Sequence, residues 1–174
     1  MSLIDGPKLD RLLAELMRAP DGAAVEMGVY QGGCLAAMAL AAPHRQVIGF
    51  DTFEGLPQEA WSEGERHKAG EFSDTSLEAV RRVVDGAPNV TLVPGVFPGS
   101  AVGINVEVAL AHVDFDFYES TKAAIEWLLP RLVRGGVVLF DDYEWPYCPG
   151  VKRAIVEFGL AVEHAHHQAI YRHA

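Results

Sequence analysis

Short hydrophobic runs alternate along the chain with longer segments in which hydrophobic residues recur at helical spacing. Apolar runs of this length, bounded by Gly, Pro, Asn or Asp, are typical of buried strands. Each run is nearly continuous in apolar residues, which indicates strands that are covered on both faces. The pattern predicts strands at residues 23–29, 46–50, 89–93, 108–115 and 136–140.

The segments between these runs have the spacing of amphipathic helices. In the first of them, Leu12, Leu13 and Leu16 share one face of the expected helix. Thr75 and Glu78 have the spacing of a capping box, which predicts that a helix begins there. Helices are therefore expected at residues 7–19, 32–42, 75–84 and 120–133.

Strands that alternate with helices predict a parallel α/β sheet. The end of the chain differs, because residues 160–165 and 169–174 both resemble strands and follow one another closely after a helix-like segment. So short a connection allows only an antiparallel hairpin. The expected fold is α/β, a doubly wound Rossmann-like sheet of five parallel strands plus a C-terminal antiparallel hairpin. We expect a single domain over residues 1–174.

Composition narrows the choice of partner. The chain has 174 residues, of which 49% are hydrophobic, and its formal net charge is −10. That charge disfavours nucleic acid and anionic membranes as main partners and favours a small molecule. The start lacks a signal pattern, and no apolar run approaches the ~20 residues of a membrane span. A cytoplasmic location is expected. Its two cysteines, Cys34 and Cys148, are too few for a disulfide framework or a zinc cluster.

Ligands of such sheets bind outside the carboxyl ends of the strands. The first strand runs into "EMGVYQGG", with Glu26 in the strand and Gly28, Gly32 and Gly33 in the turn. Tyr30 stands where a dinucleotide fingerprint needs its second glycine, so a pyrophosphate would meet a bulky side chain. A nucleoside without phosphates remains compatible. The alternative is a turn that merely joins a strand to a helix.

The second strand ends in an acid, Asp51, within "VIGFDTFEGLP". An acid at this place can accept the hydroxyl protons of a ribose, and it lies about 20 residues beyond the first turn, as that role requires. The alternative is that Asp51 caps the turn that follows it.

Two acidic pairs end the fourth and fifth strands: Asp114 with Asp116, and Asp141 with Asp142. These strands are expected to be neighbours, about 4.8 Å apart. Carboxylates so close together repel and raise one another's pKa, and a bound Mg²⁺ would relieve the repulsion. No Lys or Arg occurs in the adjoining "HVDFDFY" or "FDDYEW", so we expect the cation to come from outside. Alternatively, the acids cap helices and accept from loop amides.

Three blocks, "VEMGVYQGG", "VIGFDTFEGLP" and "DFDFYESTKAAIEWLLPRLVRGGVVLFDDY", resemble the class I S-adenosylmethionine-dependent methyltransferases. Within them the chain is similar to the macrocin O-methyltransferase-like family, which methylates sugar hydroxyls in natural products. The likeness extends from about Ala24 to Phe158. It implies a Mg²⁺-dependent transfer of a methyl group from S-adenosylmethionine to a hydroxyl of a small molecule, with a sugar of a natural product as the expected acceptor.

The resemblance also implies residue roles. Asp114, Asp141 and Asp142 would bind Mg²⁺, and the catalytic acids would be Asp114 and Asp116, one of which takes the substrate proton. "VDFDFY" is similar to the "VDADK" of catechol-type methyltransferases, whose first aspartate binds metal, and this favours Asp114 as the ligand. The implied cofactor-binding residues are Glu26, Gly28, Tyr30, Gly32, Gly33, Asp51, Thr52, Phe53 and Asp114.

In one respect the chain departs from the family. Members usually carry a longer N-terminal part that helps to close the substrate site, whereas here one helix precedes the first strand. We expect the long loop 52–74 to cover the substrate, with a partner subunit as the second candidate. Leu12, Leu13 and Leu16 would then have few partners within the chain, which suggests a homodimer.

The histidines are weaker candidates for chemistry. His112 lies within a predicted strand and is more typical of a core histidine than of a base. His164, His166, His167 and His173 fall in the terminal hairpin and are expected to be solvated surface, away from the strand ends. Two other function classes stay open: a non-catalytic partner that binds the cofactor, and a metal-assisted hydroxylase or hydrolase on the same scaffold.

Overall fold

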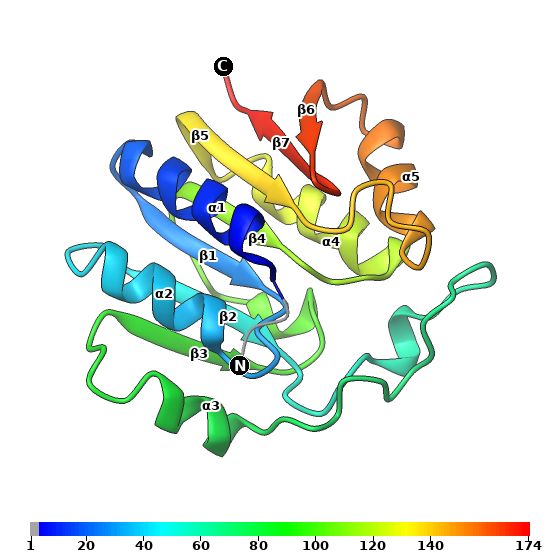
Figure 1. The fold of residues 1–174 in the computed structure, drawn as a ribbon, viewed down its shortest axis with the longest axis horizontal. Helices are drawn as coiled ribbons and strands as arrows, with labels where there is room; N and C mark the ends of the chain where they lie inside the picture. Colours follow the sequence, from blue (N-terminus) through cyan, green and yellow to red (C-terminus); the bar gives the residue numbers. More distant parts are fainter. Residues whose placement is uncertain (1–3) are drawn as a thin grey trace.

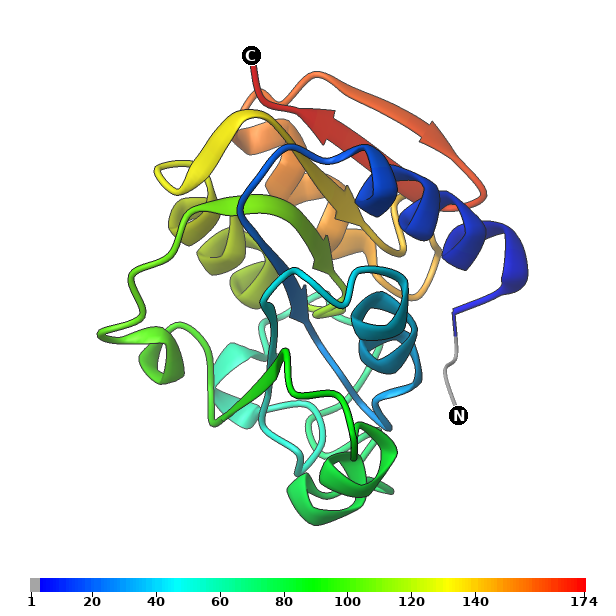
Figure 2. The same cartoon turned by 90° about the vertical axis from the view of Figure 1, so that its left-hand side faces the viewer.

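A seven-stranded sheet runs through the centre of the molecule, with helices on both faces (Figures 1 and 2). The structure, a computed structural model, describes residues 4–174. The strands, in chain order, are β1 Ala23–Met27, β2 Val47–Asp51, β3 Val90–Pro94, β4 Val108–Val113, β5 Leu132–Phe140, β6 Val162–Ala165 and β7 Gln168–Arg172.

Their order across the sheet is β3-β2-β1-β4-β5-β7-β6. The first five strands of that order pair in parallel, whereas β7 is antiparallel to both β5 and β6. The doubly wound sheet with a C-terminal hairpin, predicted from the sequence, is thus confirmed. The strand order reverses between β1 and β4, and the crevice at such a switch point is where this architecture binds ligands.

The helices form two layers. On one face α1 packs beside α2, and on the other α4 packs beside α5 (Figures 1 and 2). Their bounds are α1 Gly6–Arg18, α2 Gly33–Ala41, α3 Leu77–Val83, α4 Tyr118–Leu128 and α5 Pro149–Glu157, with short 3-10 turns η1 Gln58–Ala60 and η2 Gly99–Ala101. Within the described part of the chain, no helix is both long and apolar enough to cross a membrane.

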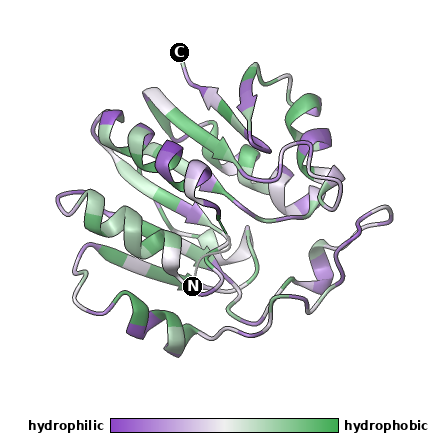
Figure 3. Ribbon diagram, viewed as in Figure 1, coloured by the Kyte–Doolittle hydropathy of each residue, from purple (hydrophilic) through white to green (hydrophobic). Residues whose placement is uncertain are grey.

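Hydrophobic residues are concentrated on the central strands, and many polar residues lie on the long segment between β2 and α3 (Figure 3). The strands β1 and β4 are buried along their whole length, which agrees with their nearly continuous apolar sequence. One hydrophobic cluster lies under α1 and α2 and another under α4 and α5.

The leucines of α1 correct one expectation. Leu12 and Leu16 are fully buried, and they pack in a cluster with Leu35 and Met38 of α2. Partly buried Leu13 packs against the same cluster. The premise that these side chains have few partners within the chain was wrong, so they no longer support a homodimer, which stays a prediction.

Two helix boundaries also differ from the sequence pattern. The helix expected over 120–133 ends at Leu128, and Leu132 already pairs with Val108 as part of β5. Pro130 explains the early end, because proline disrupts a helix interior. The capping box was misplaced by one residue, since the side chain of Ser76, not Thr75, accepts from the backbone N–H of Ala79.

Candidate active site

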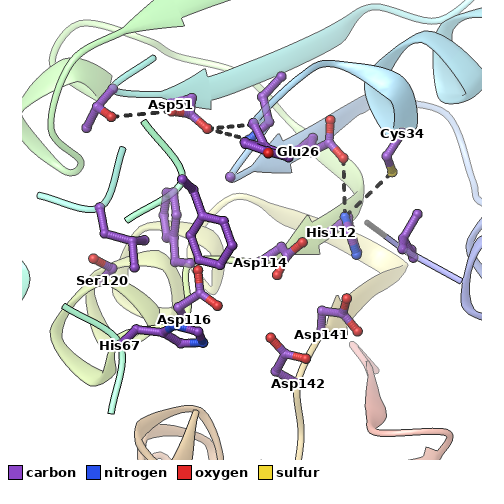
Figure 4. A pocket seen from close by; sticks show the side chains of 18 of the residues that line it. Glu26, Cys34, Asp51, His67, His112, Asp114, Asp116, Ser120, Asp141 and Asp142 are labelled. Atoms are coloured by element: carbon purple, nitrogen blue, oxygen red, sulfur yellow. Dashed lines mark hydrogen bonds and ion pairs between the residues drawn. The ribbon is translucent and has the colours of Figure 1, made fainter. Parts of the chain in front are cut away.

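A cavity of about 630 Å³ opens at the carboxyl ends of β1, β2, β4 and β5. Figure 4 shows Asp51 on one side of it, and Asp141 and Asp142 on the other. Its volume is in the range of small-molecule sites. Of the residues predicted to bind cofactor, metal or substrate, those that line it are Glu26, Gly28, Tyr30, Asp51, Thr52, Asp114, Asp116, Asp141 and Asp142.

Gly28 brings two strand ends together. Its φ is +93°, and a Cβ added there would lie 1.9 Å from the backbone oxygen of Asp114. Around it, the Asp114 N–H donates to the carbonyl of Met27, and the Gly28 N–H donates to the carbonyl of Phe50. Only glycine fits this approach. The residue therefore sets Asp114 close against the end of β1.

Asp51 is held by backbone amides. One carboxylate oxygen accepts from the N–H groups of Val29 at 2.7 Å and Tyr30 at 2.8 Å, and the other accepts from Phe53 at 2.7 Å. Asp51 therefore caps the turn that follows it, as the alternative prediction said, through Phe53. Its contacts with Val29 and Tyr30 also connect the ends of β1 and β2. The same side chain lines the cavity. Its role toward a ribose stays a prediction.

Tyr30 adopts a left-handed conformation, with φ +50°, and its hydroxyl donates to the carboxylate of Asp74. The Thr75 hydroxyl donates to the backbone carbonyl of Tyr30, so these contacts attach the end of loop 52–74 to the turn. Gly32, at φ +82°, begins helix α2 as its N-cap. Gly32, Gly33 and Phe53 lie outside the cavity's lining, and their part in cofactor binding stays a prediction.

The four aspartates at the ends of β4 and β5 form one cluster, called here the acid cluster: Asp114, Asp116, Asp141 and Asp142. A carboxylate oxygen from each of Asp114, Asp116 and Asp142 lies within 4.8 Å of the others, and the same holds for Asp114, Asp141 and a ring nitrogen of His112. The predicted convergence of the two acidic pairs is confirmed.

Burial and mutual repulsion shift these acids toward protonation. Burial, followed by the charges of Asp141, Asp116 and Asp142, raises the pKa of Asp114 well above its usual range. Burial and the charge of Asp142 raise the pKa of Asp116 to about 7. The pKa of Asp142 is raised by burial and by the charge of Asp141. In the absence of further cations, the cluster therefore resists carrying its full negative charge.

One cation reaches the cluster from α1, contrary to the expectation that positive charge must come from outside. Lys8 Nζ lies 2.6 Å from Asp141 Oδ1 and 3.6 Å from Asp142 Oδ1. Burial opposes the charged form of Lys8, but the contacts with Asp141 and Asp142 outweigh it and raise its pKa. Local sequence patterns could not reveal this contact, because Lys8 is over a hundred residues away from its partners.

Cys148 is a second residue that sequence reasoning missed. Its thiol lies 3.4 Å from Asp116 Oδ1 and 3.3 Å from Asp142 Oδ2, and it is 1% exposed. Burial and the nearby charge of Asp116 raise the pKa of this thiol, so it stays protonated and can donate. Cys148 thus links the aspartates that follow β4 and β5.

Three buried side chains, those of Glu26, Cys34 and His112, line the cavity together. Glu26 of β1 and His112 of β4 are paired residues in the sheet, each 1% exposed. Glu26 Oε1 lies 3.4 Å from His112 Nδ1, and Cys34 Sγ lies 3.8 Å from the same nitrogen. His112 is a buried histidine, as expected, and it also borders the cavity between Glu26 and the acid cluster (Figure 4).

The loop 52–74 lines the cavity through Leu56, Pro57, His67 and Phe72, in addition to Thr52. Glu65 fixes this loop to α4, because its carboxylate accepts from the Tyr118 N–H at 2.7 Å. The contact supplies an acceptor for a backbone donor in the first turn of the helix. The position of the loop supports its expected role as a cover, which stays a prediction.

The hairpin histidines need a partial correction. His166 and His167 are exposed, as predicted, but both line the cavity. Because β7 is antiparallel to β5 and Ala169 pairs with Phe140, the β6–β7 turn lies at the carboxyl end of β5. The hairpin therefore reaches the strand-end edge from which it was expected to be absent.

Aromatic rings surround the opening next to these histidines. The rings of Trp145 and His167 are 5.1 Å apart, and Trp145 is 6.3 Å from Tyr147. Tyr147 in turn lies 5.9 Å from His67 of the long loop. Trp145 is 40% exposed, so its ring is accessible to a ligand.

The residues present fit a hard divalent cation. The cluster offers carboxylate oxygens from several aspartates within a span of 4.8 Å, and carboxylates are the ligands that Mg²⁺ prefers. The ammonium group of Lys8 already stands among them as a monovalent cation. The cleft between β1, β2 and β4 also fits a nucleoside, since Asp51 and the turn around Gly28 line it.

Comparison with known proteins agrees with this geometry. Residues 8–167 match the macrocin-O-methyltransferase (TylF) family. The chain is 34% identical over 146 residues to a tetracenomycin-C rhamnosyl 4'-O-methyltransferase of Streptomyces olivaceus, an alignment that covers 73% of this chain and 55% of that protein. It is 32% identical over 155 residues to demethyldecarbamoylnovobiocin O-methyltransferase of Streptomyces niveus, covering 79% and 58%.

Among solved structures, the O-methyltransferase NovP superposes with a TM-score of 0.82 at 25% identity, over 97% of this chain and 78% of NovP. The chain spans little more than half the length of the two curated relatives. The match to the family nevertheless covers almost the whole chain, including both acidic pairs and the turn at Gly28. The chain belongs to the macrocin-O-methyltransferase (TylF) family.

Proposed function

We propose that this chain is an S-adenosylmethionine-dependent O-methyltransferase that needs Mg²⁺ and acts on a hydroxyl of a small molecule, a sugar of a natural product. One observation carries the proposal: a single cavity is lined both by a nucleoside-type turn with Asp51 and by the acid cluster. A methyl donor and a hydroxyl held by the cluster would meet in that space. The names of both relatives support O-methyl transfer, and the name of the first, which contains a rhamnosyl group, supports a sugar.

On the donor side, Asp51 would accept hydrogen bonds from the ribose hydroxyls, and the turn around Gly28 would lie against the cofactor. When bound, the cofactor supplies an electrophilic methyl group on a sulfonium. Tyr30 lines this side, and a pyrophosphate would meet its bulky side chain, which favours a nucleoside without phosphates.

On the acceptor side, Asp114, Asp141 and Asp142 would hold Mg²⁺. When bound, the metal lowers the pKa of an acceptor hydroxyl and fixes its position. Asp116 lines the same space, with a carboxylate oxygen within 4.8 Å of oxygens of Asp114 and Asp142, and it would take the hydroxyl proton. Cys148 orients Asp116 through its thiol contact.

A sugar suits the rest of the lining. Trp145, His67, His166 and His167 border the cavity on the acceptor side. A sugar presents apolar C–H faces, which pack on aromatic rings, and hydroxyls, which bond to polar side chains. The homodimer and the cytoplasmic location remain predictions beside this proposal, as does the absence of nucleic acid as a partner.

The test is a transfer assay with the purified chain. S-adenosylmethionine and Mg²⁺ are supplied with a panel of glycosides and catechols, and S-adenosylhomocysteine and methylated product are measured by mass spectrometry. We expect transfer to a glycoside, lost in excess EDTA and restored by Mg²⁺. A parallel titration measures cofactor binding without an acceptor.

Each alternative function has its own outcome. Binding of S-adenosylmethionine without formation of S-adenosylhomocysteine on any acceptor would indicate a non-catalytic partner. A chain that ignores the cofactor but consumes an acceptor in the presence of Mg²⁺ would be a hydrolase or hydroxylase. Full transfer in excess EDTA would remove Mg²⁺ from the proposal and return the acids to base and capping roles.

A further inference from the structure

We propose that Lys8 is a tethered cation that occupies the acid cluster when no divalent ion is bound and must leave when one binds. Metal binding at the cluster would then compete with a contact made by the first turn of α1. This inference rests on the Mg²⁺ site of the proposed function and concerns what that site does before the metal arrives.

The contacts of Lys8 place it inside the cluster. Its Nζ is 2.6 Å from Asp141 Oδ1 and 3.6 Å from Asp142 Oδ1, and its side chain is only 12% exposed. Both acids belong to the set that would bind Mg²⁺. The side chain of Lys8 also lines the cavity, so a metal reaching these oxygens would meet it.

The ammonium and a metal cannot share this arrangement. Mg²⁺ binds oxygen at roughly 2.0–2.1 Å, with near-octahedral geometry that leaves little room around each ligand oxygen. A lysine Nζ 2.6 Å from Asp141 Oδ1 would place a second positive charge within a few ångströms of the metal. Two cations so close repel strongly in a partly buried site. Displacement of Lys8 relieves both the crowding and the repulsion.

Lys8 is placed where it can leave. It lies in the first turn of α1, where its backbone N–H donates at 3.0 Å to the side chain of the N-cap residue Asp5. Its four-carbon stem can carry the ammonium away without moving the backbone. Further along α1, Leu12 and Leu16 are fully buried and keep the helix on the sheet. Release of Lys8 therefore leaves the rest of the helix in place.

A second lysine provides a matched control. Lys152 Nζ is also 2.6 Å from a carboxylate oxygen, that of Glu144, two residues beyond Asp142. Both side chains of that pair are more than 40% exposed, and Glu144 is not among the residues that line the cavity. Replacing Lys152 removes one positive charge from the same region without touching the acid cluster.

The experiment measures metal affinity alone, without cofactor or acceptor. Mg²⁺ is titrated into the metal-free chain by calorimetry, and Mn²⁺ by electron paramagnetic resonance. We expect Lys8→Gln to bind both ions about tenfold more tightly than the wild type, since no internal cation has to be displaced. Lys8→Arg keeps the competing charge and should stay near wild type. Lys152→Gln should change the affinity by less than about twofold.

Equal or weaker metal binding by Lys8→Gln would overturn the inference, as would an equal gain in Lys152→Gln. If neither the wild type nor Lys8→Gln binds metal, the Mg²⁺ site itself fails, and the inference with it. If Lys8→Gln binds the metal more tightly but the wild type transfers no methyl group to any acceptor, the inference stands and the proposed function is rejected.

A wild-type measurement covers the case in which Lys8→Gln does not fold. Reductive methylation with ¹³C-formaldehyde labels each lysine and keeps its charge, and the Lys8 signal is identified by its loss in Lys8→Arg. Mg²⁺ should shift the Lys8 signal toward that of an exposed lysine and leave the Lys152 signal in place. A Lys8 signal that stays unchanged at saturating Mg²⁺ would overturn the inference.

Discussion

Asp51 and the acid cluster lie at the same edge of the sheet, and they differ in which groups stabilise their negative charge. Asp51, at the end of β2, accepts three backbone N–H groups from Val29, Tyr30 and Phe53. The acid cluster, at the ends of β4 and β5, has an ion pair with Lys8 and hydrogen bonds from the thiol of Cys148. Backbone donors close in the fold stabilise the charge of Asp51. The four aspartates of the acid cluster have more negative charge than Lys8 and Cys148 can offset.

The difference separates an acid whose hydrogen bonds are complete in the fold from a cluster whose geometry fits a cation. Backbone donors come with the turn that positions them, so Asp51 is satisfied as soon as β1 and β2 pair. Four clustered carboxylates remain costly in a partly buried place until a strong cation reaches them. Removing an acid should therefore have different consequences on the two sides.

The largest effect is expected from Asp142→Asn. Methyl transfer should fall by about a hundredfold or more, because the metal would lose a charged ligand that positions and activates the acceptor. Asn tolerates the left-handed backbone at this residue, where φ is +56°. The measurement is the rate of S-adenosylhomocysteine formation at saturating cofactor.

The matched control is Glu144→Gln, an exposed acid two residues away that pairs with Lys152. It should transfer methyl groups at nearly the wild-type rate. Cofactor binding should be nearly unchanged in both variants. Comparable activity in Asp142→Asn and the wild type would contradict the assignment of Asp142 to the metal.

Asp51→Ala should weaken binding of S-adenosylmethionine by about 2 kcal/mol, roughly thirtyfold, because hydrogen bonds to a charged acceptor are lost. Mg²⁺ affinity should stay as in the wild type, since Asp51 lies with the turn and not with the acid cluster. Calorimetry with each ligand separates the two. An unaltered cofactor affinity would reduce Asp51 to a cap of its turn.

Paired Asn substitutions should move stability in opposite directions when no metal is present. Asp116→Asn removes a partly buried charge that repels Asp142, and its amide oxygen can still accept from Cys148, so we expect a gain of about 1 kcal/mol. Asp51→Asn takes an acceptor away from backbone donors and should cost about 1 kcal/mol. Urea unfolding in EDTA measures both.

Excess Mg²⁺ should stabilise both folded proteins, and the wild type by more, because the negative charge of Asp116 beside the proposed ligands strengthens Mg²⁺ binding. A loss of stability in Asp116→Asn without metal, similar to that in Asp51→Asn, would remove the contrast between the two groups of acids.

Features that depend on the local sequence pattern, such as the strands and the residues at their ends, could be predicted from the sequence. Apolar runs located the strands, and the rule that parallel strands end at one edge brought Asp114 and Asp116 together with Asp141 and Asp142. Glycine spacing marked the turn, although the reason for Gly28, the nearby backbone of Asp114, became visible only in the fold.

What failed depended on packing between distant segments. Lys8 reaches Asp141 because α1 lies across the face of the sheet, and nothing in its local sequence indicates this. His166 and His167 reach the cavity because an antiparallel strand returns its turn to the edge where β5 ends. Leu12 and Leu16 were expected to have few partners, because the apolar residues of α2 were not considered as their partners.

The smallest effect concerns an acid outside this edge, Glu15, whose charge is balanced by one distant side chain, Arg172. Arg172 of β7 donates to both carboxylate oxygens, at 2.9 and 2.8 Å, and its hydrogen bonds lower the pKa of Glu15 below the ordinary 4.5, although burial opposes this. Since Arg172 is half exposed, Glu15→Gln should cost only about 0.5 kcal/mol near neutral pH.

The pH dependence follows from the lowered pKa of Glu15. The stabilisation is complete above the unfolded value near 4.5 and is lost as the pH falls through the lower folded value. The difference between the wild type and Glu15→Gln in urea unfolding should therefore shrink in acid. Glu163→Gln is the control, because Glu163 is 73% exposed and lies 3.8 Å from Arg172. Equal losses in the two variants would show that pairing with Arg172 stabilises α1 no more than an exposed contact does.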